Sequence, residues 1–537
     1  MPKKKTTSKK QVDTLVHEEA KRPNIPTAEY ESVMDPAQQE PSTLRYARNP
    51  DLDPQLVWRG KDQQDESDLV VQAPPLYIQE KVHPKALIDD LRRQTESKEA
   101  EADSQMNLFG DFNGLPSEEA KTEFYQHDAN WSNRMILGDS LQVMGSLSER
   151  EGLRGKVQCI YLDPPYGIKF NSNFQWSTTS RDVKDGKQEH ITREPEMVKA
   201  FRDTWRDGIH TYLTYLRDRL TVARDLLTDS GSIFVQIGDE NVHRVRALMD
   251  EVFGEENFVS EVIFRKTTSS TSNMLSNVHD VIVWYGKSEA TKFRRLYKLK
   301  SDESGASAYR ESDEGIFTTS GLTSQNPGTR YPINLKGKTY KAEPGWWKTD
   351  QENMQRILKA DRLVATIRSV RYKRFLEDFP VHAIDNLWED TAGDTGKVYV
   401  VQTASEAVKR CLLMATDPGD LVLDPTCGSG TTAYVAEQWG RRWITIDTSR
   451  VALALARARI MGAKYPYYLL ADSPEGQKKE AELTRSAPSE APTHGNIRQG
   501  FVYERVPHIT LKSIANNAEI DVIWERWQTK IAPLLEQ

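Results

Sequence analysis

The chain has 537 residues, of which 37% are apolar and 28% charged, and its mean hydropathy is −0.66. A chain of this length and composition can bury a core of ordinary size and hold more than one domain. Since no apolar run approaches the roughly 18 residues that a membrane helix needs, the sequence excludes a membrane-spanning protein, and we expect no membrane partner.

The charge is distributed unevenly along the chain. The whole sequence carries a net charge of −7, but residues 291–375 hold 18 Lys and Arg against 9 Asp and Glu. This stretch therefore carries +9 and the remainder −16. Net charge is an average over the chain, whereas binding surfaces are local. One basic segment in an acidic protein therefore indicates a place where a polyanion could bind.

Cysteine and histidine usage indicates a reducing compartment and no metal site. The three cysteines, Cys159, Cys411 and Cys427, show no Cys-x-x-Cys spacing. Such a set argues against a disulfide framework and a structural zinc site, and the ten histidines have no metal-ligand spacing. The basic start, Met1 to Lys5, leads into no apolar segment, so we predict no secretory signal and a cytoplasmic protein.

The N-terminal quarter differs in composition from the rest of the chain. Residues 1–125 are dominated by Pro, Lys, Glu, Gln and Ser with weak apolar periodicity, which predicts a partly disordered extension with short ordered pieces at 69–71 and 84–91. From residue 126 to 290, apolar runs and helical spacings alternate. We expect strands at 134–137, 157–162, 232–237 and 281–285, and helices at 141–147, 212–227 and 242–249.

Residues 291–390 interrupt this alternation with an insert that is rich in Gly, Ser, Thr, Lys and Arg and contains interleaved aromatic residues. The pattern resumes in residues 391–475, with strands at 421–423 and 443–447, each followed by a helix. Residues 476–537 are predicted to be a linker and a C-terminal helical segment. Alternating strands and helices predict an α/β fold with a mostly parallel sheet.

A Gly-rich turn follows one of these strands. In LVLDPTCGSGTT, residues 421–432, a buried strand runs into the turn and then into a helix. Gly428 and Gly430 would let the backbone approach a ligand closely, and the helix N-terminus offers unpaired N–H groups. Two glycines alone are also consistent with a plain tight turn. Asp424 before the turn and Asp447 at the end of the next strand favour a nucleotide-type ligand, because such an acid suits hydrogen bonding to ribose hydroxyls.

A second motif, Asp163-Pro164-Pro165-Tyr166, ends the strand at 157–162. Two prolines fix the backbone and remove N–H donors, so their carbonyls can point outward as acceptors. A carboxylate and a proline carbonyl can together accept both hydrogens of an –NH2 group, and the tyrosine supplies a flat apolar face. An aromatic amine requires this arrangement, because its lone pair must be localised toward an electrophile. A rigid turn is the alternative interpretation of Asp-Pro-Pro.

At these residues the sequence resembles the β-class DNA amino-methyltransferases, in which DPPY precedes the target-recognition region and the Gly-rich cofactor motif follows it. The resemblance covers about residues 130–465, and it is strongest to the modification subunits of type III restriction systems. It implies a Rossmann-like class I S-adenosylmethionine-dependent methyltransferase fold. The expected architecture is a mostly parallel seven-stranded sheet with an inserted target-recognition domain.

The resemblance also implies roles for individual residues. Asp163 and the Pro164 carbonyl, beside Pro165, would hold the target amine, while Tyr166 would stack on a base flipped out of the duplex. Asp447 would bind the ribose of S-adenosyl-L-methionine. The other residues implied at the cofactor are Asp139, Asp424, Thr426, Cys427, Gly428, Gly430 and Thr431. For Gly138-Asp139, a plain strand-to-helix turn is the alternative interpretation.

The sequence departs from the family pattern at two places. Thr426 stands where the cofactor motif usually has an aromatic residue, so the packing beside the donor must differ. The segment Val401-Gln402-Thr403-Ala404-Ser405 stands where the family often has His-Pro-x-Gln-Lys-Pro.

The first residue of DPPY bears on the substrate. Asp at this position favours N6 of adenine, whereas cytosine-N4 enzymes more often have Ser and protein-glutamine methyltransferases Asn. We predict a site-specific methyltransferase acting on adenine N6 in duplex DNA, as the modification component of a restriction or phage-defence system. Direct transfer is expected, because no cysteine is placed to form a covalent intermediate. Three alternatives stay open: cytosine N4, an RNA or protein amine, and a non-catalytic DNA-recognition scaffold for a helicase-nuclease partner.

The basic insert is predicted to contact DNA, with a solvated charged face as the alternative. Lys and Arg neutralise phosphates and can read guanine edges. The expected partners are duplex DNA, a restriction or helicase subunit, and a second copy of the chain. The candidate DNA-binding residues are Arg294, Arg295, Lys298, Arg371, Lys373 and Arg374.

Overall fold

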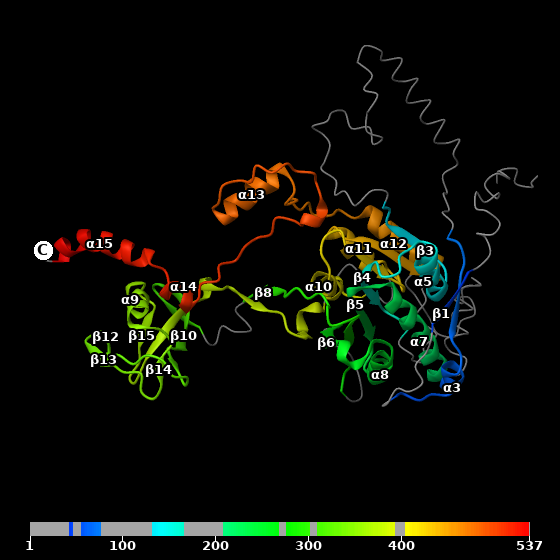
Figure 1. Cartoon of the computed structure of the whole chain (residues 1–537), viewed down its shortest axis with the longest axis horizontal. Coiled ribbons are helices and arrows are strands. Elements are labelled where there is room, and N and C mark those ends of the chain that lie inside the picture. Colours follow the sequence, from blue (N-terminus) through cyan, green and yellow to red (C-terminus); the bar gives the residue numbers. More distant parts are fainter. Residues whose placement is uncertain are drawn as a thin grey trace, which may run out of the picture.

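The computed structural model describes residues 42–46, 55–76, 131–165, 208–267, 275–300, 309–392 and 403–535 (Figure 1). Tyr166, the expected ordered piece at 84–91 and most of the N-terminal extension lie outside the described residues. Within the extension, β1 (Ser42–Tyr46) pairs in antiparallel fashion with β2 (Leu69–Ala73), and the helix α3 (Lys61–Asp65) lies between them in the chain. The ordered piece expected at 69–71 is therefore part of β2.

The largest element of the molecule is an eight-stranded sheet. Its strands are β3 (Arg134–Leu137), β4 (Val157–Leu162), β5 (Leu227–Ile237), β6 (Phe258–Arg265), β7 (His279–Gly286), β18 (Leu387–Trp388), β19 (Leu421–Asp424) and β20 (Arg442–Asp447). The strand order is β18-β6-β7-β5-β4-β19-β20-β3, and only β7 runs against the other seven. The mostly parallel sheet is confirmed. Among the described residues it has eight strands rather than the expected seven, because the chain returning from the insert adds the two-residue β18 beside β6.

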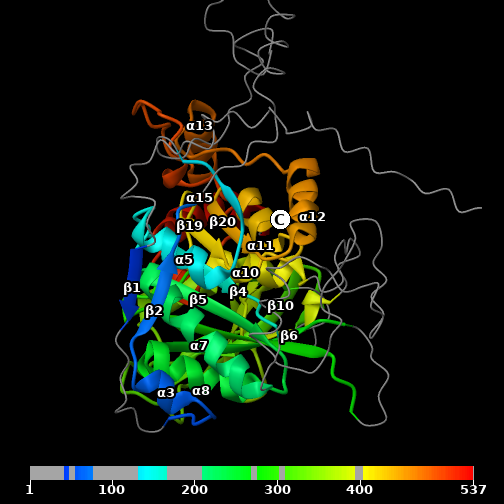
Figure 2. The same cartoon turned by 90° about the vertical axis from the view of Figure 1, so that its right-hand side faces the viewer.

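Helices cover both faces of this sheet (Figure 2). The helices on one face are α5 (Ser140–Glu149), α7 (Ile209–Leu226) and α8 (Val242–Phe253), and those on the other are α10 (Ser405–Ala415) and α11 (Thr431–Gln438), with α12 (Arg450–Gly462) beside α11. In β4, Ile160 and Leu162 belong to the first core, while Cys159 and Tyr161 belong to the second. Burial on both faces explains why this strand is one continuous apolar run in the sequence.

The parallel strands bring their carboxyl ends to one edge of the sheet. Asp447 at the end of β20 is opposite Leu137 at the end of β3. On the other side of β20, Leu423 of β19 is opposite Ile160 of β4. In open α/β sheets, ligands bind outside the carboxyl ends of the strands. The residues after β3, β4, β19 and β20 are therefore gathered at the edge where such a site is expected.

The insert forms a separate group of short antiparallel strands (Figure 1). The chain leaves the sheet along β8 (Tyr297–Leu299) and returns along β17 (Val381–Ala383), which pairs with β8. Between them lie β9 (Arg310–Ser312), β10 (Gly315–Gly321), β11 (Thr323–Ser324), β12 (Ile333–Leu335), β13 (Lys338–Tyr340), β14 (Trp346–Trp347), α9 (Gln351–Lys359), β15 (Leu363–Ala365) and β16 (Val370–Phe375). The insert has its own hydrophobic core, which includes Trp347, Ile357 and Tyr372.

The C-terminal part of the chain returns to the insert (Figure 1). Its helices are α13 (Pro474–Thr484), α14 (Leu511–Ala515) and α15 (Glu519–Leu535). Ile514 and Ala515 are buried in the core of the insert. Asp521 of α15 pairs with Arg356 and Lys359 of α9, at 2.7 Å in each case. The segment expected to be a terminal helix is therefore fixed to the insert by apolar contact and ion pairs.

The described part of the chain offers neither a membrane span nor a metal site. None of its helices combines the length and the apolar character that crossing a membrane requires. No three of its His, Cys, Asp or Glu side chains gather in a way that could hold a metal ion.

Candidate active site

Asp447 is the carboxylate at the end of β20. Its Oδ2 accepts a hydrogen bond from the backbone N–H of Gly428 (2.9 Å), and its Oδ1 accepts one from that of Ser449 (2.8 Å). Asp447 is partly exposed, whereas Ile446 before it is fully buried. Burial of the carboxyl group raises its pKa to about 6 although backbone donors oppose this shift. The structure thus links Asp447 to the Gly-rich turn, while its contact with a ribose stays a prediction.

Asp424, at the end of β19, organises the turn after that strand. The carboxylate is buried, and its Oδ1 accepts a hydrogen bond from the backbone N–H of Thr426 (2.9 Å). Burial raises the pKa of this group to about 6 as well. Its role at the methionine end of a cofactor stays a prediction.

The structure gives local reasons for the glycines of the turn, whereas the approach of a ligand to them stays a prediction. Gly428 and Gly430 have φ angles of 51° and 72°, a region that favours glycine. A Cβ atom on Gly430 would also lie 2.7 Å from the Cβ of Ala456 on α12. The close approach at Gly430 is therefore made by a neighbouring helix, and no ligand is required to explain it.

Two further residues predicted at the cofactor have buried side chains. Cys427 is 4% exposed, burial raises the pKa of its thiol well above the usual value, and its N–H donates to the carbonyl of Ile446 (2.8 Å). The hydroxyl of Thr431 lies 3.0 Å from that of Ser429 and accepts a hydrogen bond from Arg459 (2.8 Å). Both residues build the turn.

Asp139 lies beside Asp447 at the same edge, because the N–H of Gly138 donates to the Asp447 carbonyl (3.0 Å). Asp139 is the N-cap of α5, where its Oδ1 accepts from the N–H of Leu141 (2.9 Å). Its Oδ2 pairs with Arg219 of α7 at 2.5 Å. The position agrees with the predicted cofactor edge, but the carboxylate is already engaged in capping and in an ion pair.

Asp163 meets the Gly-rich turn directly. Its backbone N–H donates to Oγ1 of Thr426 (2.8 Å), and its Oδ2 accepts a hydrogen bond from Oγ1 of Thr403 (2.9 Å). Pro164 is buried and Pro165 partly buried. The two motifs, 263 positions apart in the chain, are thus in hydrogen-bond contact. The stacking role predicted for Tyr166 concerns a residue outside the described part.

Tyr212 of α7 adds an aromatic side chain near Asp163. It is fully buried, and burial raises the pKa of its phenol, with the charge of Asp163 among the further causes. Its hydroxyl has no hydrogen-bond partner within the described residues. A buried polar atom without a partner is unusual, so this hydroxyl is a group that a ligand near Asp163 could satisfy.

The six predicted DNA-binding residues differ in their surroundings. Five of them are exposed, and Lys373 is buried. Three form ion pairs, with the partners Asp417 for Arg294, Asp390 for Lys298, and Glu314 and Asp361 for Lys373. Arg410 and Lys298 hold the pKa of Asp390 well below its usual range.

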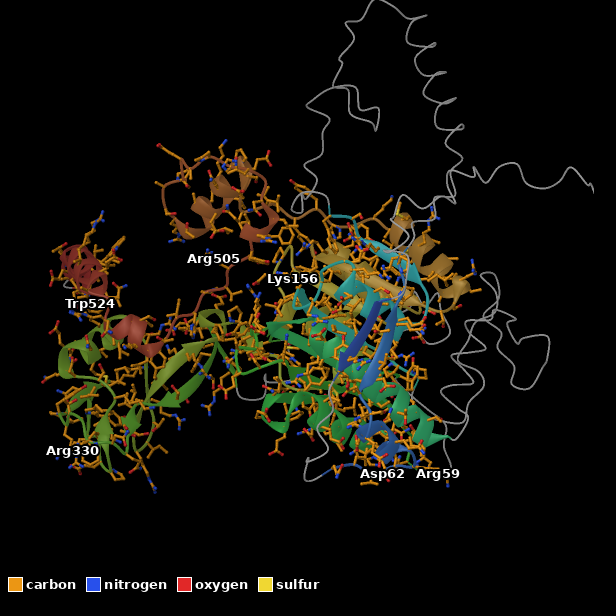
Figure 3. All side chains as sticks on the ribbon, turned by 45° about the vertical axis from the view of Figure 1, so that its right-hand side comes forward. Arg59, Asp62, Lys156, Arg330, Arg505 and Trp524 are labelled. Atoms are coloured by element: carbon orange, nitrogen blue, oxygen red, sulfur yellow. The ribbon has the colours of Figure 1, made fainter. Side chains whose placement is uncertain are left out.

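Lys373 is the residue that fits a DNA contact least well. It is only 6% exposed, and its ammonium lies 5.5 Å and 5.6 Å from the ring centres of Phe317 and Phe375. Its position indicates packing within the insert. Conversely, Arg330 was not among the predicted residues but is exposed at the end of the insert (Figure 3), where it lies 4.7 Å from the ring centre of Trp346.

Sequence reasoning also missed three residues at the sheet edge. Thr403 was recognised only as part of a departure from the family pattern, and Arg219 and Tyr212 only as members of a helix. For Arg219 and Tyr212, the available signal was a helix that follows the DPPY strand and presents an arginine and tyrosines on one face. Thr403 gave no such signal, because its partner is 240 positions away.

Comparisons with known proteins identify the family to which the chain is similar. The model of a family described as DNA methylase matches residues 157–458. The type II methyltransferase M.EcaI of Enterobacter cloacae is 29% identical over 353 residues, which are 63% of this chain and 70% of that protein. The StyLTI Mod subunit, from a type III restriction-modification enzyme of Salmonella typhimurium, is 25% identical over 359 residues, or 60% of this chain and 53% of that subunit. This chain thus spans about half the length of that Mod subunit.

Solved structures give weaker likenesses. A putative DNA modification methylase from Thermus thermophilus, complexed with S-adenosyl-L-methionine, has 16% identity and a TM-score of 0.31, covering 62% of this chain and 94% of that one. The cytosine-N4-specific PvuII DNA methyltransferase has 16% identity and a TM-score of 0.32, covering 61% and 86%. Both scores are low, so the fold assignment depends on the strand order of the sheet itself.

Proposed function

Because the chain belongs to the family of N6/N4 DNA methylases, we propose that it transfers a methyl group from S-adenosyl-L-methionine to N6 of adenine in duplex DNA. One observation carries the proposal: the hydrogen bond from the N–H of Asp163 to Thr426 joins the amine motif to the cofactor turn. A donor held by one motif and an amine held by the other are thereby brought to the same place. Catalysis then comes mainly from positioning and polarisation.

The residues after β4 suit an exocyclic amine. The Asp163 carboxylate and the Pro164 carbonyl would accept the two hydrogens of the –NH2 group. Accepting both hydrogens favours a pyramidal nitrogen, whose lone pair can then attack the methyl carbon. The proton that the amine loses on methylation can leave through the carboxylate. Asp in place of Ser or Asn at position 163 supports adenine.

The carboxyl edge of the sheet suits the proposed donor. Asp447 uses its two oxygens for backbone N–H groups, but a carboxylate has about four lone-pair sites, so acceptor capacity remains for ribose hydroxyls. Thr426 and Gly428 beside it are partly exposed, while the strand residues before them are buried. When bound, the donor supplies an electrophilic methyl group on its sulfonium centre.

The insert is the proposed DNA-recognition region. Its exposed cations include Arg371, Arg374 and Arg330, on a unit with its own core. Such groups neutralise phosphates in a way that depends on salt concentration. A base pair must open for methylation, which costs a few kcal/mol. Stacking of the flipped base in a pocket can offset a cost of about this size. Tyr166 remains the proposed stacking residue.

We also propose that the protein is the modification component of a restriction-modification system. A type II methyltransferase and a type III Mod subunit are both among its relatives. A restriction subunit is accordingly a proposed partner, and a second copy of the chain is another. Co-expression with a candidate restriction subunit, followed by size-exclusion chromatography, tests both associations.

Nucleoside mass spectrometry tests the proposed reaction. The full chain is incubated with duplex DNA from a methylation-deficient host and methyl-labelled S-adenosyl-L-methionine, and the DNA is digested to nucleosides. Labelled N6-methyldeoxyadenosine is the expected product, and Asp163→Ala is the control that should abolish it.

The other outcomes are distinct. Labelled N4-methyldeoxycytidine would show that the substrate base is cytosine and not adenine, and the proposed methyl transfer to DNA would still hold. Label in RNA or protein but not in DNA would overturn the substrate. Binding of DNA and donor without any transfer would overturn the enzyme and support a recognition scaffold.

A further inference from the structure

Two threonine hydroxyls hold Asp163 from two other elements. Thr426 belongs to the turn after β19, and Thr403 lies just before α10, whose first residue is Ser405. Thr426 binds the backbone of Asp163 at 2.8 Å, whereas Thr403 binds its carboxylate at 2.9 Å. These two contacts fix different degrees of freedom, because one sets the position of the Cα atom and the other the rotation of the side chain.

The Thr426 hydroxyl continues the pairing of β4 with β19 beyond the end of the ladder. The last register pair of these strands is Ile160 with Leu423. Further on, the N–H of Asp163 finds Oγ1 of Thr426 in place of a backbone carbonyl. Because that oxygen accepts from Asp163, its own hydrogen is available for Oδ1 of Asp424, at 3.3 Å. An aromatic side chain at position 426 could make neither bond.

The Thr403 hydroxyl acts on the carboxylate itself. It donates to Oδ2 of Asp163, and a hydrogen bond to a charged acceptor is stronger and more directional than one between neutral groups. A carboxylate held at one oxygen has a defined plane, so the direction in which the other oxygen points is defined as well. The reaction depends on that direction, because the oxygen must meet a hydrogen of the target amine.

We propose that Thr403 and Thr426 are positioning residues for methyl transfer, which act by fixing the carboxylate and the backbone of Asp163. The inference rests on the proposed function and deepens it. It also gives a reason for both departures from the family pattern, since each places a hydroxyl within 3 Å of an Asp163 atom. The family resemblance implied Thr426 at the cofactor, but its hydroxyl accepts from the N–H of Asp163 and lies 3.3 Å from Oδ1 of Asp424, so we assign that hydroxyl to Asp163 and not to the donor. The two threonines therefore affect turnover more than donor binding.

The test compares isosteric and conservative variants of the full chain. Thr403→Val and Thr426→Val keep the shape of the side chain but remove the hydroxyl, whereas Thr403→Ser and Thr426→Ser keep it. The measurements are kcat and KM for transfer of labelled methyl from S-adenosyl-L-methionine to unmethylated duplex DNA. The dissociation constant for the donor is determined separately by titration calorimetry, and the thermal midpoint reports folding.

Thr416→Val is the matched control. Thr416 lies just past the other end of α10, is fully buried, and donates its hydroxyl to the carbonyl of Leu412 (2.6 Å). Removing this hydroxyl also costs buried hydrogen bonds, including the one that it accepts from Nε of Arg441 (3.0 Å), but at the opposite edge of the sheet. The control should lower the thermal midpoint and leave kcat unchanged.

Each valine variant is expected to lower kcat about 10- to 100-fold, because misplacing a reacting group by a fraction of an ångström has costs of this order. The donor dissociation constant should change by less than about twofold, and each serine variant should recover kcat to within about threefold. Wild-type turnover in both valine variants would overturn the proposal. Serine variants as slow as the valine variants would overturn it too, because the methyl group and not the hydroxyl would then matter. If the wild-type chain transfers no label at all, the proposed function falls together with this inference.

Discussion

The sheet edge and the insert differ in how well local sequence predicted them. At the edge, Asp163, Asp424 and Asp447 come from three neighbouring strands and are linked through one turn. In the insert, Arg371 and Arg374 are exposed, whereas Lys373 on the same strand is buried in an ion-paired site. A parallel sheet guarantees that strand ends meet, whereas a count of charges does not say which of them reach solvent.

Removal of the central carboxylate should have the largest effect. Asp163→Ala is expected to lower the rate of methyl transfer about 10³-fold or more, which exceeds the cost of losing a single hydrogen-bond donor at an active site. Donor affinity should remain within about threefold, because the hydrogen bond from Asp163 to Thr426 of the cofactor turn uses the backbone N–H, which alanine retains. Transfer and donor titration with the same preparation check both parts. A proportional loss of transfer rate and donor affinity would show that the amine motif and the cofactor turn do not have separate roles.

The Gly-rich turn should be sensitive for structural reasons. Gly430→Ala is expected to reduce the free energy of unfolding by about 2–4 kcal/mol, because a positive φ and an approach of 2.7 Å to Ala456 both oppose a Cβ atom. Urea unfolding followed by circular dichroism measures this change. Gly462→Ala is the control, since a Cβ atom there meets nothing within 4 Å, and it should stay within about 0.5 kcal/mol of wild type. Equal stability of the two variants would refute the packing explanation.

Donor binding should depend on pH through Asp447. Burial raises the pKa of this carboxyl to about 6, so the acceptor form dominates at pH 8 and is lost as the pH falls through that value. Affinity for S-adenosyl-L-methionine should then fall by about tenfold for each pH unit below 6. Titration calorimetry from pH 5 to pH 8 measures the slope. Asp447→Asn should bind the donor more weakly at pH 8, and its affinity should depend less steeply on pH. Any pH dependence that remains in this variant belongs to Asp424, whose pKa is also about 6.

The smallest expected effects are on DNA binding, and they should distinguish the exposed arginines of β16 from the buried lysine on the same strand. Arg371→Ala and Arg374→Ala should each weaken DNA binding about 3- to 10-fold at low salt and reduce the salt slope by about one, because both side chains are exposed. Lys373→Ala should leave the salt slope unchanged and reduce the stability of the insert by about 1–2 kcal/mol, because its ammonium is paired and its stem is packed. Fluorescence anisotropy with labelled duplex at several salt concentrations distinguishes them. A reduced slope for Lys373→Ala would restore it as a DNA contact.

Much of the fold was predictable from local patterns. The strands expected at 134–137 and 157–162 are β3 and β4 with the same bounds, because apolar runs ending at Gly-Asp and Asp-Pro-Pro have unambiguous ends. β6 was not expected, since it alternates buried and exposed residues only in part. β18 was not expected either, because two residues carry no periodicity and Trp388 is buried only through the path of the returning chain.

Within the candidate site, the sequence predicted functional residues but not always the neighbours that surround them in the fold. Gly430 was assigned to ligand approach, and the structure adds that α12 leaves no room for a Cβ atom there. Cys427 was placed at the cofactor and has a buried thiol. In both cases the decisive neighbour belongs to another element, so no spacing within the motif could reveal it.

By itself, the sequence determined the family, the order of the two motifs and the strands that precede them, because strand ends and turns are properties of consecutive residues. Only the tertiary structure decided that Thr403 and Thr426 hold Asp163, and that Lys373 pairs with acids instead of facing solvent. The threonine contacts join residues 240 and 263 positions apart. The path of the chain through the insert and back decides which of these distant residues meet. That path depends on how whole elements pack and not on any local pattern.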